Sequence, residues 1–273
     1  MAFVRTRDGI NLHYTDLGSG PPVVLIHGWP LNGDMWDYQA RFLAGNGFRV
    51  VAYDRRGFGR SDKPWDGYNY DNFSDDLADL IETLELRDVS LVGFSMGGGE
   101  IARYAARHGT GRLRKAALVA AVTPFLLETP DHHNGVKREV FDQMIDGLEA
   151  DRPHFLAEFG KKFFGVGFLG GGVSSEMLQW SLMMAMQASP KATIDCVRAF
   201  GETDFRGDMP KLDIPVLVIH GYEDKTVPID IAGRAAAEAL PDARLVEYRS
   251  APHGLFITEK DRLNRDLLDF LRG

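Results

Sequence analysis

One short segment, residues 89–109, restricts the possible folds of this chain more than any other. It reads VSLVGFSMGGGEIARYAARHG. Its first part is typical of a buried strand, and its last part has the spacing of a helix. Ser95 lies at the junction, with Gly93 and Gly97 two residues to either side. A serine on so tight a turn exposes its hydroxyl, and the glycines avoid collisions with the neighbouring strand and helix. The segment predicts a nucleophilic serine; the alternative is a simple structural turn.

Five further apolar runs lack the alternation of a half-buried strand, which favours a parallel sheet covered on both faces. Together the six runs lie at residues 22–28, 49–54, 89–94, 115–122, 215–221 and 244–248. Helical patterns alternate with them at 72–86, 98–109, 231–240 and 261–273, and Ser74 or Asn72 is expected to cap the first. This alternation predicts a doubly wound α/β fold. Residues 3–20 are expected to form an antiparallel edge hairpin that turns at Asp8-Gly9.

The alternation stops between residues 124 and 209. No strand-like run occurs there, and aromatic and Met-rich helical patterns occupy 138–151, 153–165 and 175–189. We therefore predict a core made of residues 1–123 and 210–273 and a helical cap made of residues 124–209. A flexible turn within the cap is expected at 168–175, FLGGGVSS.

Charge and cysteine content argue against several classes of protein. The net charge is −8, and no cluster of Lys and Arg offers a surface for nucleic acid or for anionic membranes. No run of about 18 apolar residues predicts a membrane span, and the charged opening does not resemble a signal peptide, so a cytoplasmic protein is expected. The single cysteine, Cys196, is interpreted as a buried apolar residue. Because Cys/His spacings typical of metal sites are absent, we expect no metal site.

A serine nucleophile needs a histidine base and an acid that orients it. Among the eight histidines, His253 follows the last predicted strand, at the edge of the sheet where Ser95 is expected. His27 and His220 each end a strand in the sequence Ile-His-Gly and are interpreted as scaffold.

Two carboxylates, Glu223 and Asp224, come just after the strand at 215–221. We favour Asp224, because a short carboxylate three residues beyond Gly221 suits a tight loop. The predicted order is then Ser95, Asp224 and His253, which is the order found in the α/β-hydrolase fold.

Several segments extend this resemblance beyond the fold. IHGWPLNGDMW, YDRRGFGRSD, LVGFSMGGGE, AVTPF, DCVRAFGETDFR and APHG together resemble the cofactor-free haloperoxidase and aryl esterase family, across nearly the whole chain. The resemblance implies an esterase, perhydrolase or γ-lactamase that works without metal or haem. It also implies a homo-oligomer, either a trimer or a hexamer.

The predicted oxyanion hole consists of two backbone N–H groups, those of Met96 and Trp29. The alternative for Trp29 is a core aromatic. In the family, a proline at the position of Pro30 accompanies perhydrolysis, in which hydrogen peroxide attacks the acyl-enzyme in place of water. A plain turn proline is an equal alternative for Pro30.

The resemblance also implies an apolar acyl or aryl pocket lined by Pro30, Val122, Phe159, Phe163 and Phe200. That pocket suits small aromatic esters better than charged substrates. Residues 54–62, DRRGFGRSD, do not match a phosphate-binding loop and are interpreted as a loop held by salt bridges.

We predict a serine hydrolase of small aryl esters, with perhydrolase activity that oxidises bromide indirectly through a peracid. Dehalogenases and many epoxide hydrolases need a carboxylate at the elbow, which Ser95 does not provide. A γ-lactamase or amidase with the same triad remains an alternative. A receptor that turns over its ligand slowly is an alternative from another class, and rapid multiple turnover on aryl esters discriminates against it.

Overall fold

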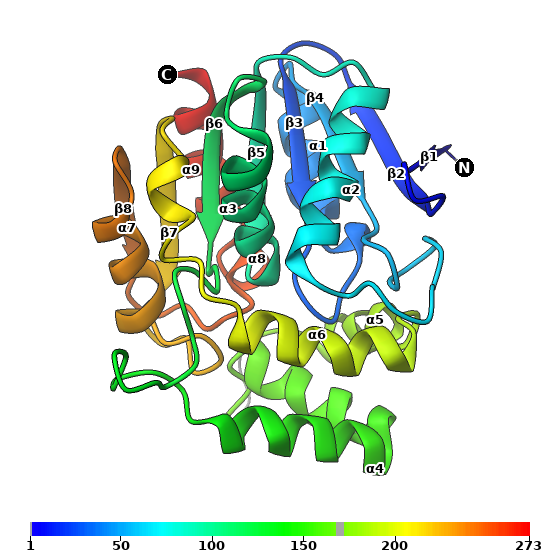
Figure 1. Cartoon of the computed structure of the whole chain (residues 1–273), viewed down its shortest axis with the longest axis vertical. Coiled ribbons are helices and arrows are strands. Elements are labelled where there is room, and N and C mark those ends of the chain that lie inside the picture. Colours follow the sequence, from blue (N-terminus) through cyan, green and yellow to red (C-terminus); the bar gives the residue numbers. More distant parts are fainter. Residues whose placement is uncertain (1, 168–171) are drawn as a thin grey trace.

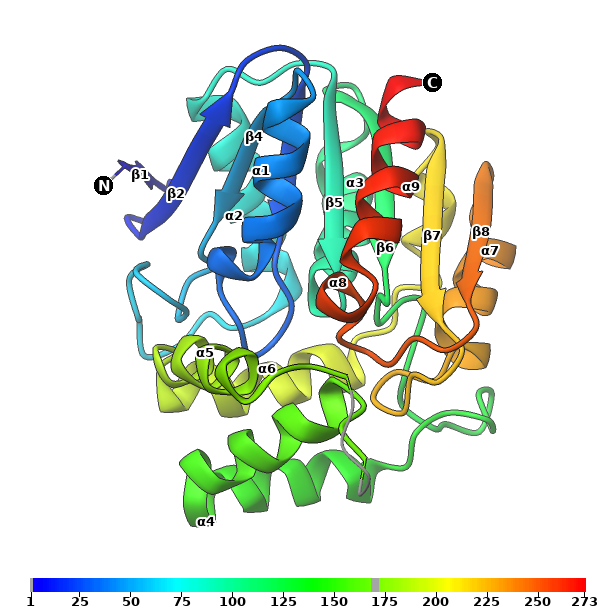
Figure 2. The same cartoon turned by 180° about the vertical axis from the view of Figure 1, so that it is seen from behind.

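A computed structural model describes residues 2–167 and 172–273 of the chain and contains an eight-stranded sheet between layers of helices (Figures 1 and 2). The strand order is β1-β2-β4-β3-β5-β6-β7-β8, and only β2 runs against the direction of its neighbours. The predicted α/β-hydrolase fold is confirmed. The strands are β1 (Ala2–Arg5), β2 (Asn11–Gly18), β3 (Pro22–Ile26), β4 (Arg49–Tyr53), β5 (Val89–Phe94), β6 (Leu113–Val119), β7 (Val216–Gly221) and β8 (Ala243–Tyr248).

Helices cover both faces of the sheet, which is why its central strands are apolar on both sides. One face packs against α2 and α3, with α7 at the far end, as Figure 1 shows; the other packs against α1 and α9, as Figure 2 shows. The helices are α1 (Asp37–Gly45), α2 (Tyr70–Thr83), α3 (Met96–His108), α4 (Arg138–Phe163), α5 (Ser175–Met186), α6 (Pro190–Glu202), α7 (Ala235–Ala239), α8 (Leu255–Thr258) and α9 (Lys260–Arg272).

The predicted edge hairpin is present, because β1 and β2 pair antiparallel and the chain turns between Thr6 and Ile10. The predicted cap of α2 is wrong. The side chain of Asn69 accepts the Asn72 backbone N–H, while the Ser74 hydroxyl donates to the Asp71 carbonyl. Asn69 precedes the helix in extended conformation, the usual geometry of an N-cap.

Helices α4, α5 and α6 lie between β6 and β7 in sequence and next to the carboxyl ends of the strands in space (Figure 1). The two helical patterns at 138–151 and 153–165 belong to α4, which is kinked at Asp151, where φ is −156° and ψ is 84°. Pro153 and the Asp151 carboxylate, which accepts the His154 N–H, begin the second half. The turn predicted at 168–175 lies partly outside the described residues, and the division into core and cap remains a prediction.

None of the helices in residues 2–167 and 172–273 is long and apolar enough to cross a membrane.

Candidate active site

Ser95 occupies a strained turn between β5 and α3. Its φ is 53° and its ψ is −116°, a conformation that L-residues rarely adopt. The Ser95 N–H donates to the Val119 carbonyl at 2.9 Å. A Cβ on Gly93 would lie 2.5 Å from the Gly97 carbonyl oxygen, and one on Gly97 would lie 2.6 Å from the Ile26 carbonyl oxygen. Because any side chain at either glycine would collide with backbone, the sharp turn requires both.

The structure brings Ser95, His253 and Asp224 together from three loops. The Ser95 Oγ lies 3.0 Å from His253 Nε2, and His253 Nδ1 lies 2.6 Å from Asp224 Oδ2. All three side chains are buried. The His253 loop is held by the Gly254 N–H, which donates to the Phe163 carbonyl at 2.7 Å. The candidate nucleophile, base and acid are thus arranged in the hydrogen-bonded series that acyl transfer needs.

Asp224 is held in its ionised form by its surroundings. Its Oδ1 accepts the backbone N–H groups of Thr226 and Val227 at 2.9 and 2.8 Å. Burial acts to raise the pKa of Asp224, but His253 and a second ring, that of His220, outweigh it, so the pKa lies below its ordinary value. His220 Nε2 lies 3.4 Å from Asp224 Oδ2 and 2.9 Å from the Val227 carbonyl. His220, interpreted from the sequence as scaffold, therefore lies next to the candidate acid.

Met96 and Trp29 are buried residues near Ser95, and neither of their backbone N–H groups has a backbone acceptor among the described residues. Buried amides are seldom left without an acceptor. The parallel pairing of Ile26 in β3 with Gly93 in β5 places the two loops side by side, and a Cβ on Gly28 would lie 3.0 Å from the Ser95 Cβ. Free donors at this point suit the oxygen of a bound carbonyl.

The triad opens into a small apolar cavity of about 50 Å³. Three of the predicted pocket residues, Val122, Phe159 and Phe200, line it together with Trp29. The cavity is far smaller than the 300–1,000 Å³ typical of sites for drug-sized ligands. Without movement of α4 or α6, which contribute to its lining, it admits only a small group.

The two other predicted pocket residues, Pro30 and Phe163, line a neighbouring apolar cavity of about 340 Å³ between α4 and α5. Phe159 lines both cavities and is therefore part of the wall between them. Its ring packs edge-on against Trp29 at 5.1 Å, and the Phe163 ring packs against His253 at 4.9 Å.

Sequence reasoning missed several residues that line the triad cavity. They share an apolar character and come mainly from the segment that leads into α4 and from its first half: Leu126, Val136, Val140, Phe141, Met144 and Val227. Their spacing does not distinguish them from core residues. The exposure of Val140, at 45%, is unusual for such a residue but becomes visible only in the folded chain.

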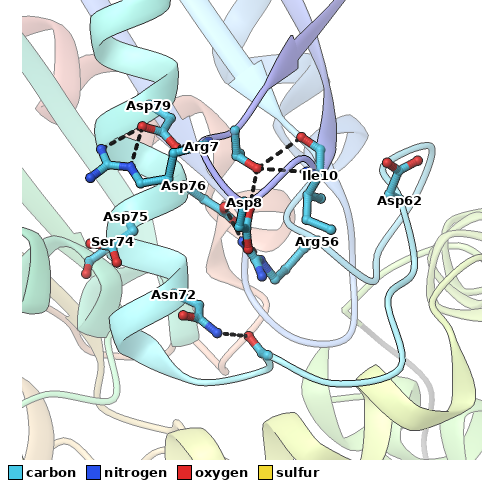
Figure 3. Close-up of polar contacts among 12 residues, drawn as sticks. Arg7, Asp8, Ile10, Arg56, Asp62, Asn72, Ser74, Asp75, Asp76 and Asp79 are labelled. Atoms are coloured by element: carbon cyan, nitrogen blue, oxygen red, sulfur yellow. Dashed lines mark hydrogen bonds and ion pairs between the residues drawn. The ribbon is translucent and has the colours of Figure 1, made fainter.

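The loop at 54–62 is held by ion pairs, as predicted. Arg56 donates to Asp76 on α2 at 2.6 Å and to Asp8 in the edge hairpin at 2.8 Å (Figure 3). Its neighbour Arg55 pairs with Glu100 on α3 at 2.7 Å, and neither of those two side chains is exposed at all. The loop is thus tied to both helices on that face of the sheet.

Cys196 is buried, as expected. Within residues 2–167 and 172–273, no three His, Cys, Asp or Glu side chains gather as a metal ion would require.

Comparison with known proteins agrees with the geometry. The family model described as alpha/beta hydrolase fold matches residues 21–165. The chain is 46% identical over 273 residues to a non-heme chloroperoxidase of Kitasatospora aureofaciens, covering 99% of each chain. It is 39% identical to a bifunctional esterase/perhydrolase of Acinetobacter calcoaceticus, covering 100% of both. The crystal structure of a bromoperoxidase from Bacillus anthracis superposes with a TM-score of 0.96 at 45% identity, covering 100% of this chain and 99% of the other.

Proposed function

The chain belongs to the α/β-hydrolase family, within the group of non-heme haloperoxidases and esterase/perhydrolases, and we propose that it hydrolyses small carboxylic esters through an acyl-enzyme on Ser95. The observation that carries the proposal is the series of contacts from Ser95 through His253 to Asp224, which ends in a small apolar cavity.

In the proposed reaction, the Ser95 hydroxyl attacks the ester carbonyl while His253 Nε2 accepts its proton. Asp224 accepts the Nδ1–H, fixes the tautomer of the ring and stabilises the imidazolium that forms. The Met96 and Trp29 N–H groups donate to the oxyanion of the tetrahedral intermediate. His253 then protonates the departing alcohol, and water attacks the acyl-enzyme by the same steps in reverse.

Hydrogen peroxide replaces water in the second proposed activity. Its attack on an acetyl-enzyme gives peracetic acid and frees Ser95. The peracid then transfers one oxygen atom to bromide, giving acetic acid and hypobromite, so halide oxidation occurs away from the protein. Support comes from the position of Pro30, directly after Trp29, and from the chloroperoxidase and perhydrolase names of the relatives.

Two assays test the proposal. The wild type is expected to hydrolyse phenyl acetate over many turnovers, and Ser95→Ala is expected to lose this activity. Bromination that depends on acetate and peroxide is expected to disappear in the same variant. Bromination that persists in Ser95→Ala, or that requires an added metal, would contradict the peracid route.

The resemblance to the family also supports a homo-oligomer, a trimer or a hexamer. Light scattering after size-exclusion chromatography tests this, and a monomer at micromolar concentration would contradict it.

A further inference from the structure

A fully buried ion pair links the two elements that carry the candidate oxyanion donors. Glu100 lies on α3, one helical turn after Met96. Its Oε2 accepts the Nε–H of Arg55, which lies in the loop after β4, at 2.7 Å. Neither side chain is exposed to solvent. This pair plays no part in the proton transfers proposed above.

Arg55 continues from Glu100 to the end of β3. Its Nη2 donates to the His27 carbonyl at 2.8 Å, and its backbone N–H donates to His27 Nε2 at 2.9 Å. Because Nε2 accepts a hydrogen bond, the proton of the neutral ring lies on Nδ1. Burial and then the nearby Arg55 charge lower the pKa of His27 to about 3, so the ring is neutral at physiological pH.

His27 Nδ1–H in turn donates to the Gly28 carbonyl at 3.0 Å, and the Leu31 N–H donates to the same oxygen at 3.0 Å. The Gly28 carbonyl and the Trp29 N–H belong to one peptide unit, whose atoms lie in a plane. Two donors that fix the direction of the carbonyl therefore fix the direction of the Trp29 N–H as well.

This arrangement is costly, which argues that it serves more than packing. Burial raises the pKa of Glu100 well above its ordinary value and lowers that of Arg55 to about 10, so the protein interior disfavours both charges. Apolar residues of similar volume often stabilise a fold as well as a buried ion pair does. Glu100 Oε1 also lacks a hydrogen-bond partner among the described residues.

We propose that the Arg55–Glu100 pair, acting through His27, sets the position of the Trp29 N–H relative to the Met96 N–H and so shapes the oxyanion hole. Arg55, Glu100 and His27 are then positioning residues, since none of them contacts the substrate. The inference rests on the proposed esterase function and deepens it, because it concerns the transition state rather than substrate binding.

The test compares Glu100→Gln with Asp76→Asn. Each change replaces a carboxylate by an amide of nearly the same shape. In each ion pair the arginine and the carboxylate are both buried, and the two arginines, Arg55 and Arg56, are neighbours in the same loop. Glu100→Gln is expected to lower kcat for phenyl acetate about 10- to 100-fold, the range expected for a small displacement of a catalytic group, with KM changed less than twofold. Asp76→Asn is expected to lower the melting temperature but not kcat.

A second readout separates transition-state binding from stability. Phenyl trifluoromethyl ketone forms a tetrahedral oxyanion with a serine, whereas acetophenone does not mimic that state. Glu100→Gln is expected to weaken inhibition by the trifluoromethyl ketone by the same factor as kcat and to leave inhibition by acetophenone unchanged. The acid limb of the pH–rate profile is expected to stay in place, because the contact of His253 with Asp224 is untouched.

The double variant Arg55→Met, Glu100→Leu keeps the proposal testable if Glu100→Gln does not fold. It replaces the pair with apolar side chains and is expected to fold at least as stably as Glu100→Gln, yet to show the same loss of kcat. Wild-type kcat in the folded double variant, or equal losses of kcat in Glu100→Gln and Asp76→Asn, would overturn the proposal. A wild type that does not hydrolyse phenyl acetate, or a Ser95→Ala variant that does, would instead overturn the proposed function.

Discussion

Replacing Asp224 by asparagine tests the arrangement of charge and protons behind Ser95. Asp224 Oδ2 accepts the His253 Nδ1–H at 2.6 Å, while its Oδ1 accepts two backbone N–H groups, those of Thr226 and Val227. An asparagine of the same shape keeps its oxygen on the backbone donors and turns its NH₂ group toward His253. The ring must then accept at Nδ1, so its proton moves to Nε2, where it faces Ser95 and prevents proton abstraction.

This loss of the correct tautomer is expected to lower kcat by about 10⁴-fold, which corresponds to about 5.4 kcal/mol of transition-state stabilisation. KM is expected to change little, because neither Asp224 oxygen is exposed to a substrate. Steady-state hydrolysis of phenyl acetate at pH 7 measures both quantities, and circular dichroism checks that the variant is folded.

Glu223→Gln is the matched control, because Glu223 is the adjacent carboxylate and is exposed. It is expected to retain kcat within twofold. A folded Asp224→Asn enzyme within tenfold of the wild type would refute the reasoning. A large loss of kcat in Glu223→Gln, with kcat retained in Asp224→Asn, would show that Glu223 rather than Asp224 is the acid.

Three further predictions follow from particular side chains. Because burial and then Arg55 lower the pKa of His27 from 6.5 to about 3, the unfolded chain binds one more proton than the native state between these values. This group alone therefore reduces stability as the pH falls from about 6.5 toward about 3, by about 1.4 kcal/mol per pH unit. Urea unfolding of His27→Gln should show a shallower pH dependence than the wild type, and identical slopes would contradict a buried neutral ring. Gly93→Ala is expected to destabilise the fold by at least 1–3 kcal/mol, roughly the range for overpacking, because its Cβ would lie 2.5 Å from a carbonyl oxygen. Gly45→Ala is the control and is expected to be neutral or stabilising, because nothing lies within 4 Å of a Cβ at that position. Equal changes in the free energy of unfolding for the two variants would refute the clash. Phe159→Ala is expected to join the cavities of about 50 and about 340 Å³. The ratio of kcat/KM for p-nitrophenyl hexanoate to that for p-nitrophenyl acetate is then expected to rise at least about tenfold. An unchanged ratio would show that Phe159 does not limit the size of the acyl group.

The sheet and the order of its elements along the chain were predictable because each buried strand carries an unbroken apolar run. Ser95 was predictable as a candidate nucleophile because glycines lie two residues to either side of it. Three helices were not predicted, namely α1, α6 and the four-residue α8, and the first two were missed for physical reasons. Helix α1 is short and carries a mixture of polar and apolar residues, and α6 contains three β-branched residues, a glycine and several charged residues. In both cases packing against other elements, rather than local pattern, decides the structure.

The contacts within the site were less predictable than its members. The two Ile-His-Gly sequences look alike, yet His27 holds the Gly28 carbonyl while His220 lies beside Asp224. The two histidines differ because the His27 ring accepts from Arg55 in the loop after the neighbouring strand β4, whereas the His220 ring contacts the loop that follows its own strand, β7. Likewise, Pro30 and Phe163 line the cavity of about 340 Å³ rather than the one at Ser95, whereas Phe159, on the same half of α4 as Phe163, lines both.

Covalent labelling of Ser95 tests the central claim most directly. A p-nitrophenyl phosphonate ester would be incubated with the enzyme, and the released p-nitrophenolate, the residual esterase activity and the labelled peptide would be measured together. The account predicts one equivalent released per chain, activity lost in proportion, and the label on Ser95 alone. Full activity after labelling, or a label on any other residue, would contradict a catalytic serine at this position.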